Sequence, residues 1–163
     1  MHQVEQSSVV ARPAAEVWAR AVSEEGINHE LSPILRMTMP SGLRGKTIDD
    51  VEVGVPLGRS WILLGRILPV DYDDLQLAEL EPGRRFLERS KTATFDPWQH
   101  ERVIEAVDER SCRVTDRLGF ELKPWIHWVP GSVRIATAIV RFLFRHRHRR
   151  LTTDAAGDTK RSG

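Results

Sequence analysis

The sequence predicts an α+β fold in which a curved antiparallel sheet of six or seven strands wraps around a long C-terminal helix. Three observations lead to this fold class: a strand and two short helices open the chain, short β-type runs separated by turn residues fill its middle, and one long apolar helix ends it. A sheet must bury one face against another layer. The final helix is the only predicted element large enough to provide that layer.

Length and composition indicate one globular domain. We place it at residues 1–151 of the 163, followed by a disordered polar tail over 152–163. Lys and Arg total 24 against 23 Asp and Glu, and the formal net charge of +1 gives no overall electrostatic reason to expect nucleic acid or a membrane as partner. The single cysteine, Cys112, excludes an intrachain disulfide, and the N-terminus shows no export signal. We therefore expect a cytoplasmic protein.

The N-terminal segment reads as one strand followed by two helices. The strand is expected over 4–12 and stops before Pro13, which suits the first turn of a helix. The apolar side chains that follow have the i, i+3, i+4, i+7 spacing of a helix with one buried face: Ala14, Val17, Trp18 and Ala21. Residues 24–31 are expected to form a second short helix, with Ser23 as its N-cap.

The middle of the chain reads as a meander of strands. Runs rich in β-branched and aromatic residues alternate there with Gly, Pro and Asp. The turn residues at 81–84 and 108–111 indicate hairpins, so consecutive strands are expected to pair antiparallel. The pattern is weakest over 40–59. The expected strands are 35–39, 50–53, 60–68, 74–80, 86–95, 98–107 and 113–122.

The last predicted element is a helix that begins at Ser132 and is expected to end near Leu151. More than half of its circumference is apolar, so it needs cover on several sides. We expect it to lie inside the curved sheet and to leave an apolar cavity between helix and sheet. Its end carries the run RHRHRR. We attribute these charges to the negative end of the helix dipole rather than to contact with lipid or nucleic acid.

Four segments carry a resemblance to a known protein family. They are AEVWARAV, ELEPGRRFLERS, WQHERVIEAVDERSCRVTDRLGFEL and IVRFLFRHRHRRL. Together they resemble the helix-grip superfamily that includes START domains, birch-pollen-allergen-like proteins and polyketide cyclases, known as SRPBCC proteins. The hairpin is the most specific segment, since it is similar to a Trp-x-His-x-Arg strand paired with a Thr-Asp-Arg strand in a bacterial subgroup with few assigned activities. The resemblance covers nearly the whole chain and implies a helix-grip fold with a cavity for a hydrophobic ligand.

The hairpin supplies the candidate polar residues. Period-two alternation places His100 and Arg102 on one face of the first strand and Asp116 on one face of the second. One register sets Arg102 opposite Asp116 and His100 near Leu118, whereas a slip by one residue breaks this pairing. Two interpretations stay open. We favour a structural ion pair with a packed imidazole over a polar cluster that orients a ligand carbonyl or carboxylate.

The expected cavity wall combines these polar groups with apolar side chains of the sheet and the last helix. Its members are Trp61, Leu63, Phe86, Trp98, His100, Arg102, Asp116, Phe120, Ile135, Ile139 and Phe142. The connection KPWIHWVPG places Trp125, His127 and Trp128 just before the last helix. We consider three roles for this connection: a lid over the cavity, a patch for a partner or a membrane, or part of the core.

The motifs of several enzyme classes are absent. The sequence has no phosphate-binding glycine loop, no HExxH and no GxSxG, and His146 and His148 are two apart on a helix and so lie on different faces. We therefore expect no metal and no cofactor, and we assign no catalytic residue. The main hypothesis is binding of a small hydrophobic or aromatic molecule such as a lipid, a quinone or a polyketide-like compound. A cyclase- or dehydratase-like enzyme and a membrane- or protein-docking module are the alternatives, with no nucleic acid and either a monomer or a homodimer.

Overall fold

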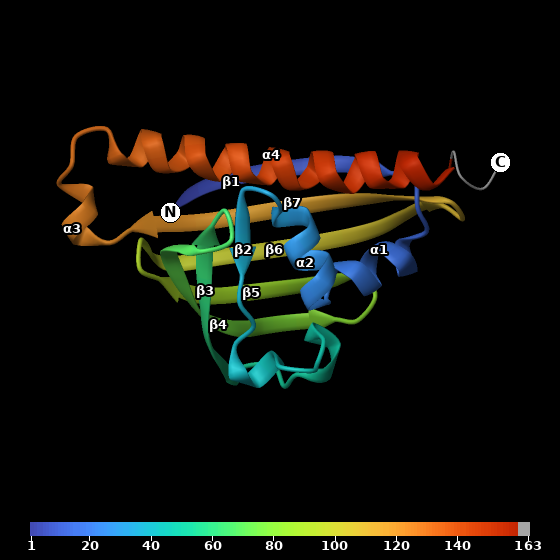
Figure 1. The fold of residues 1–163 in the computed structure, drawn as a ribbon, viewed down its shortest axis with the longest axis horizontal. Coiled ribbons are helices and arrows are strands. Elements are labelled where there is room, and N and C mark those ends of the chain that lie inside the picture. The colour runs from blue at the N-terminus through green and yellow to red at the C-terminus, as the bar shows by residue number, and fades with distance from the viewer. Residues whose placement is uncertain (160–163) are drawn as a thin grey trace.

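Seven antiparallel strands form one sheet in the computed structural model, which describes residues 1–159 (Figure 1). The strand order is β1-β7-β6-β5-β4-β3-β2, so the first strand returns to pair with the last. Along β7, from Cys112 to Leu118, inward residues alternate with more exposed ones, as the period of two predicts. The strands are β1 (His2–Val10), β2 (Leu35–Met37), β3 (Pro56–Leu64), β4 (Leu68–Glu81), β5 (Arg85–Thr92), β6 (Phe95–Asp108) and β7 (Ser111–Leu122).

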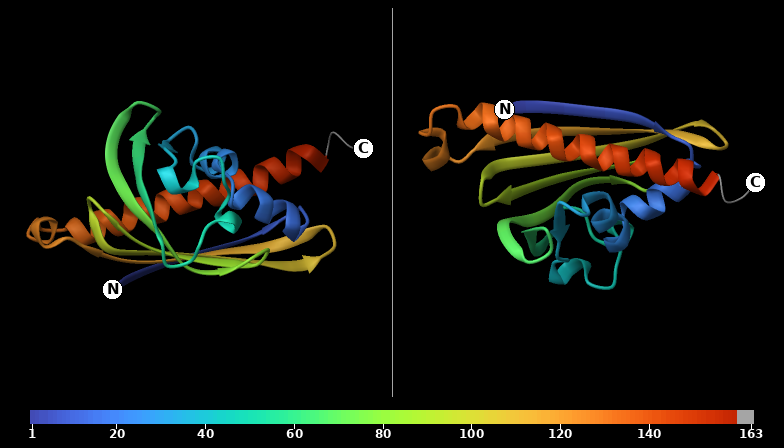
Figure 2. Two further views of the ribbon diagram at one scale, coloured as in Figure 1. Left: turned by 90° about the horizontal axis from the view of Figure 1, so that it is seen from below. Right: turned by 45° about the horizontal axis from the view of Figure 1, so that its top comes forward.

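The helices cover the concave face of this sheet, as both views in Figure 2 show. α4 packs along β1, and α2 lies between α4 and β2. This arrangement is the helix-grip fold that the sequence predicted. Within the described residues, no helix combines the length and the apolar character that a membrane span needs. The helices are α1 (Ala14–Ala21), α2 (Glu24–Leu31), the 3-10 turns η1 (Ser41–Leu43) and η2 (Ile48–Asp50), α3 (Pro124–His127) and α4 (Ser132–Thr159).

The corner between α1 and α2 is set by local chemistry. α1 buries Val17, Trp18 and Ala21, as their spacing predicted. Ser23 caps α2, since its Oγ accepts a hydrogen bond of 3.1 Å from the backbone N–H of Gly26. A Cβ at position 26 would lie 1.9 Å from the carbonyl oxygen of Arg20, so the close approach of the two helices requires glycine there.

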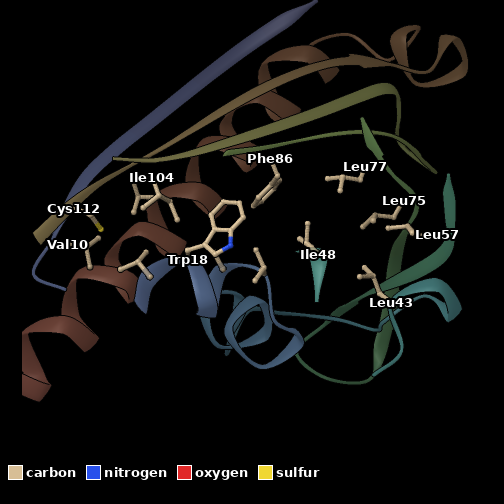
Figure 3. Close-up of a cluster of buried hydrophobic side chains, with 14 of the residues drawn as sticks. Val10, Trp18, Leu43, Ile48, Leu57, Leu75, Leu77, Phe86, Ile104 and Cys112 are labelled. Carbon is tan, nitrogen blue, oxygen red and sulfur yellow. The ribbon is translucent and has the colours of Figure 1, made fainter. Parts of the chain in front are cut away.

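Two apolar clusters hold the helices on the sheet. The larger one packs Trp18 of α1 against Phe86 of β5 and Ile104 of β6 (Figure 3). The smaller one packs Val140 and Phe144 of α4 against side chains of β1 and β7: Val4, Leu118 and Phe120. The N-terminal half of α4 is therefore in direct contact with the sheet, while the larger cluster surrounds the space under α1 and α2.

Two of the local differences from the sequence prediction have a clear local cause. Residues 50–53 form no strand, because Thr47 and Asp50 make a capping box in which Asp50 Oδ2 accepts a 2.8 Å hydrogen bond from the Thr47 N–H, and this starts η2 instead. The last helix does not stop near Leu151. It continues to Thr159 because Ala155, 1% exposed, packs into the larger cluster. The predicted tail over 152–163 is thus helical up to 159, and 160–163 lie outside the described residues.

Candidate functional site

A cavity of about 70 Å³ lies between the sheet and the layer made by α1, α2 and the η1–η2 segment. Figure 3 shows the apolar side chains around this space. They include Leu43, Ile48, Leu57, Leu75, Leu77 and Phe86, and the polar lining residues are Ser60, Glu88, His100 and Arg147. The prediction placed the cavity between the sheet and the C-terminal helix. Among the described lining residues α4 supplies only Arg147, because Val140 and Phe144 fill the space between α4 and the sheet.

The sheet side of the cavity carries buried polar atoms whose hydrogen bonds are incomplete. Ser60 is 0% exposed, and its Oγ has no hydrogen-bond partner among the described residues. Asp73 lies opposite Ser60 on the neighbouring strand and is 4% exposed. Its Oδ1 is also buried and has no hydrogen-bond partner among the described residues. A buried polar atom without a partner destabilises a fold by about 1–3 kcal/mol. The fold keeps two such atoms on one face of β3 and β4.

Two carboxyl groups lie close together beside Ser60. Burial and the negative charge of Glu88 raise the pKa of Asp73 well above its ordinary range, and the Ser90 hydroxyl opposes this only in part. The protonated form of Asp73 is thereby favoured, which would let it donate as well as accept a hydrogen bond. Glu88 is itself held in place, since its Oε1 accepts a 2.7 Å hydrogen bond from Ser90 Oγ.

His100 connects the cavity to a buried carboxylate. Its Nε2 lies 2.9 Å from Asp116 Oδ1, and its ring packs edge-on against Phe86 and Phe144. Burial alone would raise the pKa of Asp116, but the charge of Arg102 and hydrogen bonds from Arg102 and His100 hold that pKa well below its ordinary range. A carboxylate only accepts hydrogen bonds, so His100 Nε2 carries the hydrogen. The other nitrogen, Nδ1, faces Glu88, with Oε2 4.0 Å away.

Behind the cavity, Arg102 is the centre of a buried ion network. It is 0% exposed and makes two hydrogen bonds to Asp116, at 2.8 and 2.7 Å, and two to Glu30, at 2.7 and 2.9 Å. Arg147 donates to Glu30 Oε2 at 3.0 Å, and His148 Nε2 lies 2.9 Å from Asp116 Oδ2. The network joins α2 and α4 to β6 and β7. Removing one member would leave a buried charge unpaired.

The sequence left the hairpin register open, and the structure has the register in which Arg102 pairs with Asp116 and His100 with Leu118. The prediction that His146 and His148 lie on different faces of the last helix is confirmed, since His148 bonds Asp116 whereas His146 Nε2 bonds the carbonyl oxygen of Ser32. Among the described residues, no group of three or more His, Cys, Asp or Glu side chains is arranged to hold a metal ion.

The predicted cavity residues divide into four sets. Phe86 and His100 line the cavity, and Arg102 and Asp116 lie behind it. Trp98 and Phe120 belong to the smaller apolar cluster. The others are exposed or half-buried and do not line this cavity: Trp61 and Leu63 on β3, and Ile135, Ile139 and Phe142 on α4. On β3 the alternation has the opposite phase to the expected one, so Ser60 is buried while Trp61 is 47% exposed against Tyr72.

The predicted lid residues do not border this cavity. Trp125 is 69% and Trp128 87% exposed, so neither folds into the core, and His127 is also exposed. Figure 1 shows α3 beyond the end of β7, at the opposite end of the molecule from α1. Sequence reasoning missed six polar residues of the site: Glu30, Ser60, Asp73, Glu88, Arg147 and His148. The one available signal was Glu30, a charged side chain on the apolar side of a short helix.

Comparison with known proteins identifies the family and the fold. A sequence model described as "Domain of unknown function (DUF8410)" matches residues 8–154. No curated protein matches the chain. Similar solved structures include the Zhui aromatase/cyclase from Streptomyces sp. R1128, with a TM-score of 0.67 at 14% identity over 99% of this chain and 98% of that one. A START superfamily protein from Mycobacterium smegmatis aligns with a TM-score of 0.62 at 12% identity over 93% and 97% of the two chains.

A third similar structure is the di-domain ARO/CYC BexL from the BE-7585A biosynthetic pathway, with a TM-score of 0.65 at 16% identity. That alignment covers 94% of this chain and 46% of the larger protein. Identities at this level establish the fold alone. The chain thus shares the helix-grip fold of these structures and belongs to the DUF8410 family, a domain of unknown function.

Proposed function

We propose that the protein binds one small apolar or aromatic molecule with a polar end in the cavity under α1 and α2. The observation that carries this proposal is Ser60, a residue of the cavity lining whose buried hydroxyl has no hydrogen-bond partner among the described residues. A ligand atom that bonds this hydroxyl removes a penalty of about 1–3 kcal/mol. The apolar body of the ligand would contact Leu75, Leu77 and Phe86, as in ordinary apolar sites with a few polar groups.

The size of the cavity limits the ligand. About 70 Å³ gives room for roughly five water molecules at about 10–15 Å³ each, which corresponds to a single ring. An aromatic ligand is also in keeping with the similar solved structures, since two of them are aromatase/cyclases. A lipid or a polyketide-like compound would need the η1–η2 segment to move outward.

Binding of phenol and toluene tests the proposal, because the two molecules have the same ring and differ only in one substituent. Phenol has a hydroxyl group where toluene has a methyl group. Calorimetry and NMR titration should show saturable binding of both, with phenol bound more tightly. Ser60→Ala should remove the preference for phenol and leave toluene binding unchanged. Ser132→Ala is the matched control, since Ser132 is also buried with an unpartnered Oγ but does not line the cavity.

A variant that fills the cavity provides a second test of the binding proposal. Leu75→Phe should abolish binding of both rings while the circular dichroism spectrum stays that of the wild type. The proposal is wrong if neither ring binds saturably to the wild type, or if Leu75→Phe leaves the affinities unchanged. It is also wrong if Ser60→Ala and Ser132→Ala alter phenol binding equally.

A cyclase- or dehydratase-like activity is the second candidate, and the geometry of His100 favours it. A buried carboxylate, Asp116, orients the ring, and Nδ1 lies on the side of Glu88, another cavity residue. An imidazole oriented by a carboxylate is the arrangement of an activated general base. Arg102 and Asp116 lie behind the cavity and are not among the residues that line it, whereas His100 is. His100 is therefore the residue that would accept a proton from a carbon next to a carbonyl group.

Deuterium exchange into cyclohexanone tests this candidate with a ketone of ring size. The wild type in heavy water should accelerate exchange at the carbons next to the carbonyl, as followed by NMR, and His100→Gln should return the rate to that of buffer. Leu75→Phe should do the same by closing the cavity. An exchange rate equal to that of buffer with the wild type would eliminate the base role while leaving the binding proposal untouched.

A further inference from the structure

The positive charge of this protein is concentrated in one segment. Residues 123–153 contain seven Lys and Arg and no Asp or Glu. Because the whole chain has a formal net charge of +1, the remaining residues together carry −6. Two of the arginines are engaged by α2: Arg147 pairs with Glu30, and Arg150 Nε donates a hydrogen bond to the carbonyl oxygen of His29. The other four arginines are on α4 and are exposed.

The same segment exposes an apolar surface. On α4, Ile135, Ile139 and Phe142 follow the i, i+4, i+7 spacing of one helix face, and they are 59%, 53% and 57% exposed. The α3 connection adds Trp125 and Trp128, described above as exposed. On the opposite side of α4, Ala136, Val140 and Phe144 are buried against the core. The apolar stripe is thus on a part of α4 that the sheet does not cover.

Exposed arginines flank this stripe on the helix surface. Arg134, Arg141, Arg145 and Arg149 are all exposed. Residues 123–153 present Trp, Phe and Ile beside a row of Arg and contain no acidic residue, which is the composition of interfacial helices that lie on membranes. Figures 1 and 2 show α3 and the start of α4 projecting beyond α2 at one end of the molecule, where a flat surface can reach them.

We propose that α3 and the outward face of α4 dock on the surface of an anionic lipid membrane, with Trp125, Trp128, Ile139 and Phe142 at the headgroup boundary and the flanking arginines on lipid phosphates. Charge decides between the occupants. A second copy of the chain on this face would bring two arginine rows together, and a nucleic acid would leave Ile135, Ile139 and Phe142 against phosphates. An anionic lipid surface matches both the cationic row and the apolar stripe. The proposal is independent of the ligand in the cavity.

Flotation with vesicles tests the docking. The full chain should float with vesicles of equal parts phosphatidylcholine and phosphatidylglycerol, should float far less with phosphatidylcholine alone, and should be released by salt. Each arginine near an anionic surface contributes about fivefold to binding. The pair Arg141→Glu with Arg145→Glu should therefore weaken binding by well over tenfold. The matched control is Arg110→Glu with Arg113→Glu, the same charge change on exposed residues near the β6–β7 turn.

The apolar part is tested separately. Trp128→Ala should weaken binding to the mixed vesicles severalfold, whereas Trp61→Ala, which removes an exposed tryptophan from β3, should not. Leu75→Phe should leave vesicle binding unchanged, so failure of the cavity proposal and failure of docking are distinguishable. The docking proposal is overturned if the mixed vesicles do not capture the chain, or if the two charge-reversed pairs behave alike. It is equally overturned if light scattering shows a dimer that Phe142→Glu dissociates, or if duplex DNA binds and Trp128→Ala has no effect on vesicles.

Discussion

Two groups of buried polar side chains lie in the interior of this fold, and they differ in whether their hydrogen bonds are complete. Around Arg102, the carboxylate of Asp116 accepts four hydrogen bonds, and both oxygens of Glu30 bind arginine. On β3 and β4, Ser60 and Asp73 each keep one buried oxygen that no described residue satisfies. Buried polarity alone is therefore a poor indicator of a binding site. The complete group fixes the helices, and the incomplete group is where a ligand gains most.

The largest effect is expected from breaking the complete group. Arg102→Ala leaves Glu30 and Asp116 buried without their main partner, and loss of one member of a buried ion pair destabilises proteins by about 3–5 kcal/mol. The free energy of unfolding in urea should fall by that amount. Arg117→Ala is the control, since Arg117 is 56% exposed and pairs with Glu5 and Glu101 at the surface, where losses stay below about 1 kcal/mol. Equal losses in the two variants would contradict the structural role of the network.

The same group should dominate acid unfolding. Burial alone would raise the pKa of Glu30, but the charges of Arg102 and Arg147 hold it below its ordinary value of 4.5, and the pKa of Asp116 lies well below 3.8. A lowered folded-state pKa contributes stability that is present above the unfolded-state pKa and is lost as pH falls through the folded-state pKa. The free energy of unfolding should therefore drop steeply below about pH 4.5. Glu30→Gln should make the drop shallower, and an unchanged slope would show that Glu30 is not involved.

The contrast between the two groups also explains how far the sequence could be followed. Period-two alternation was enough to predict the faces on which His100, Arg102 and Asp116 lie, but it left the register of the β6–β7 hairpin open, and only the folded sheet sets Arg102 opposite Asp116. Glu30 and His148 complete that group from α2 and α4, elements far from the hairpin in sequence. Their positions depend on how the helices dock, which no local pattern contains. The helix-grip fold was predicted because the order of elements leaves few ways to cover the sheet.

The cavity itself was harder to predict than the fold. Its location depends on side-chain volumes: Phe144 fills the space under α4, whereas the residues under α1 and α2 leave room. Register shifts in β3 after Pro56 and Ile62 interrupt the alternation there, which is why Ser60 rather than Trp61 faces inward. Exposure of Ile139 and Phe142 was not evident either, since an apolar helix face is ordinarily a buried one.

A moderate effect of opposite sign is expected at Asp73. Burial and the nearby Glu88 raise its pKa, so its contribution to stability is largest below about pH 3.8 and declines as pH rises toward the folded-state pKa. Asp73→Asn should therefore stabilise the protein near neutral pH, by about 1–2 kcal/mol, through removal of a poorly satisfied carboxyl group. Asp74→Asn is the adjacent control. Asp74 is exposed and paired with Arg59, so its loss should lower stability slightly. Destabilisation by Asp73→Asn at neutral pH would contradict the assignment.

The smallest effect, and the sharpest test of the comparison, is expected at Ser60. Because its Oγ is buried without a partner in the described structure, Ser60→Ala removes a desolvated hydroxyl and loses no hydrogen bond. Chemical unfolding of the ligand-free protein should show a gain of up to about 1 kcal/mol, while the preference for phenol over toluene disappears. Ser90→Ala is the contrasting change, since it removes the 2.7 Å hydrogen bond to Glu88 and should destabilise the protein by about 1 kcal/mol. Opposite signs for these two buried serines would show that the Ser60 hydroxyl is kept for something other than stability. Destabilisation by both changes would place Ser60 with the complete group and remove the main support for a ligand at this wall.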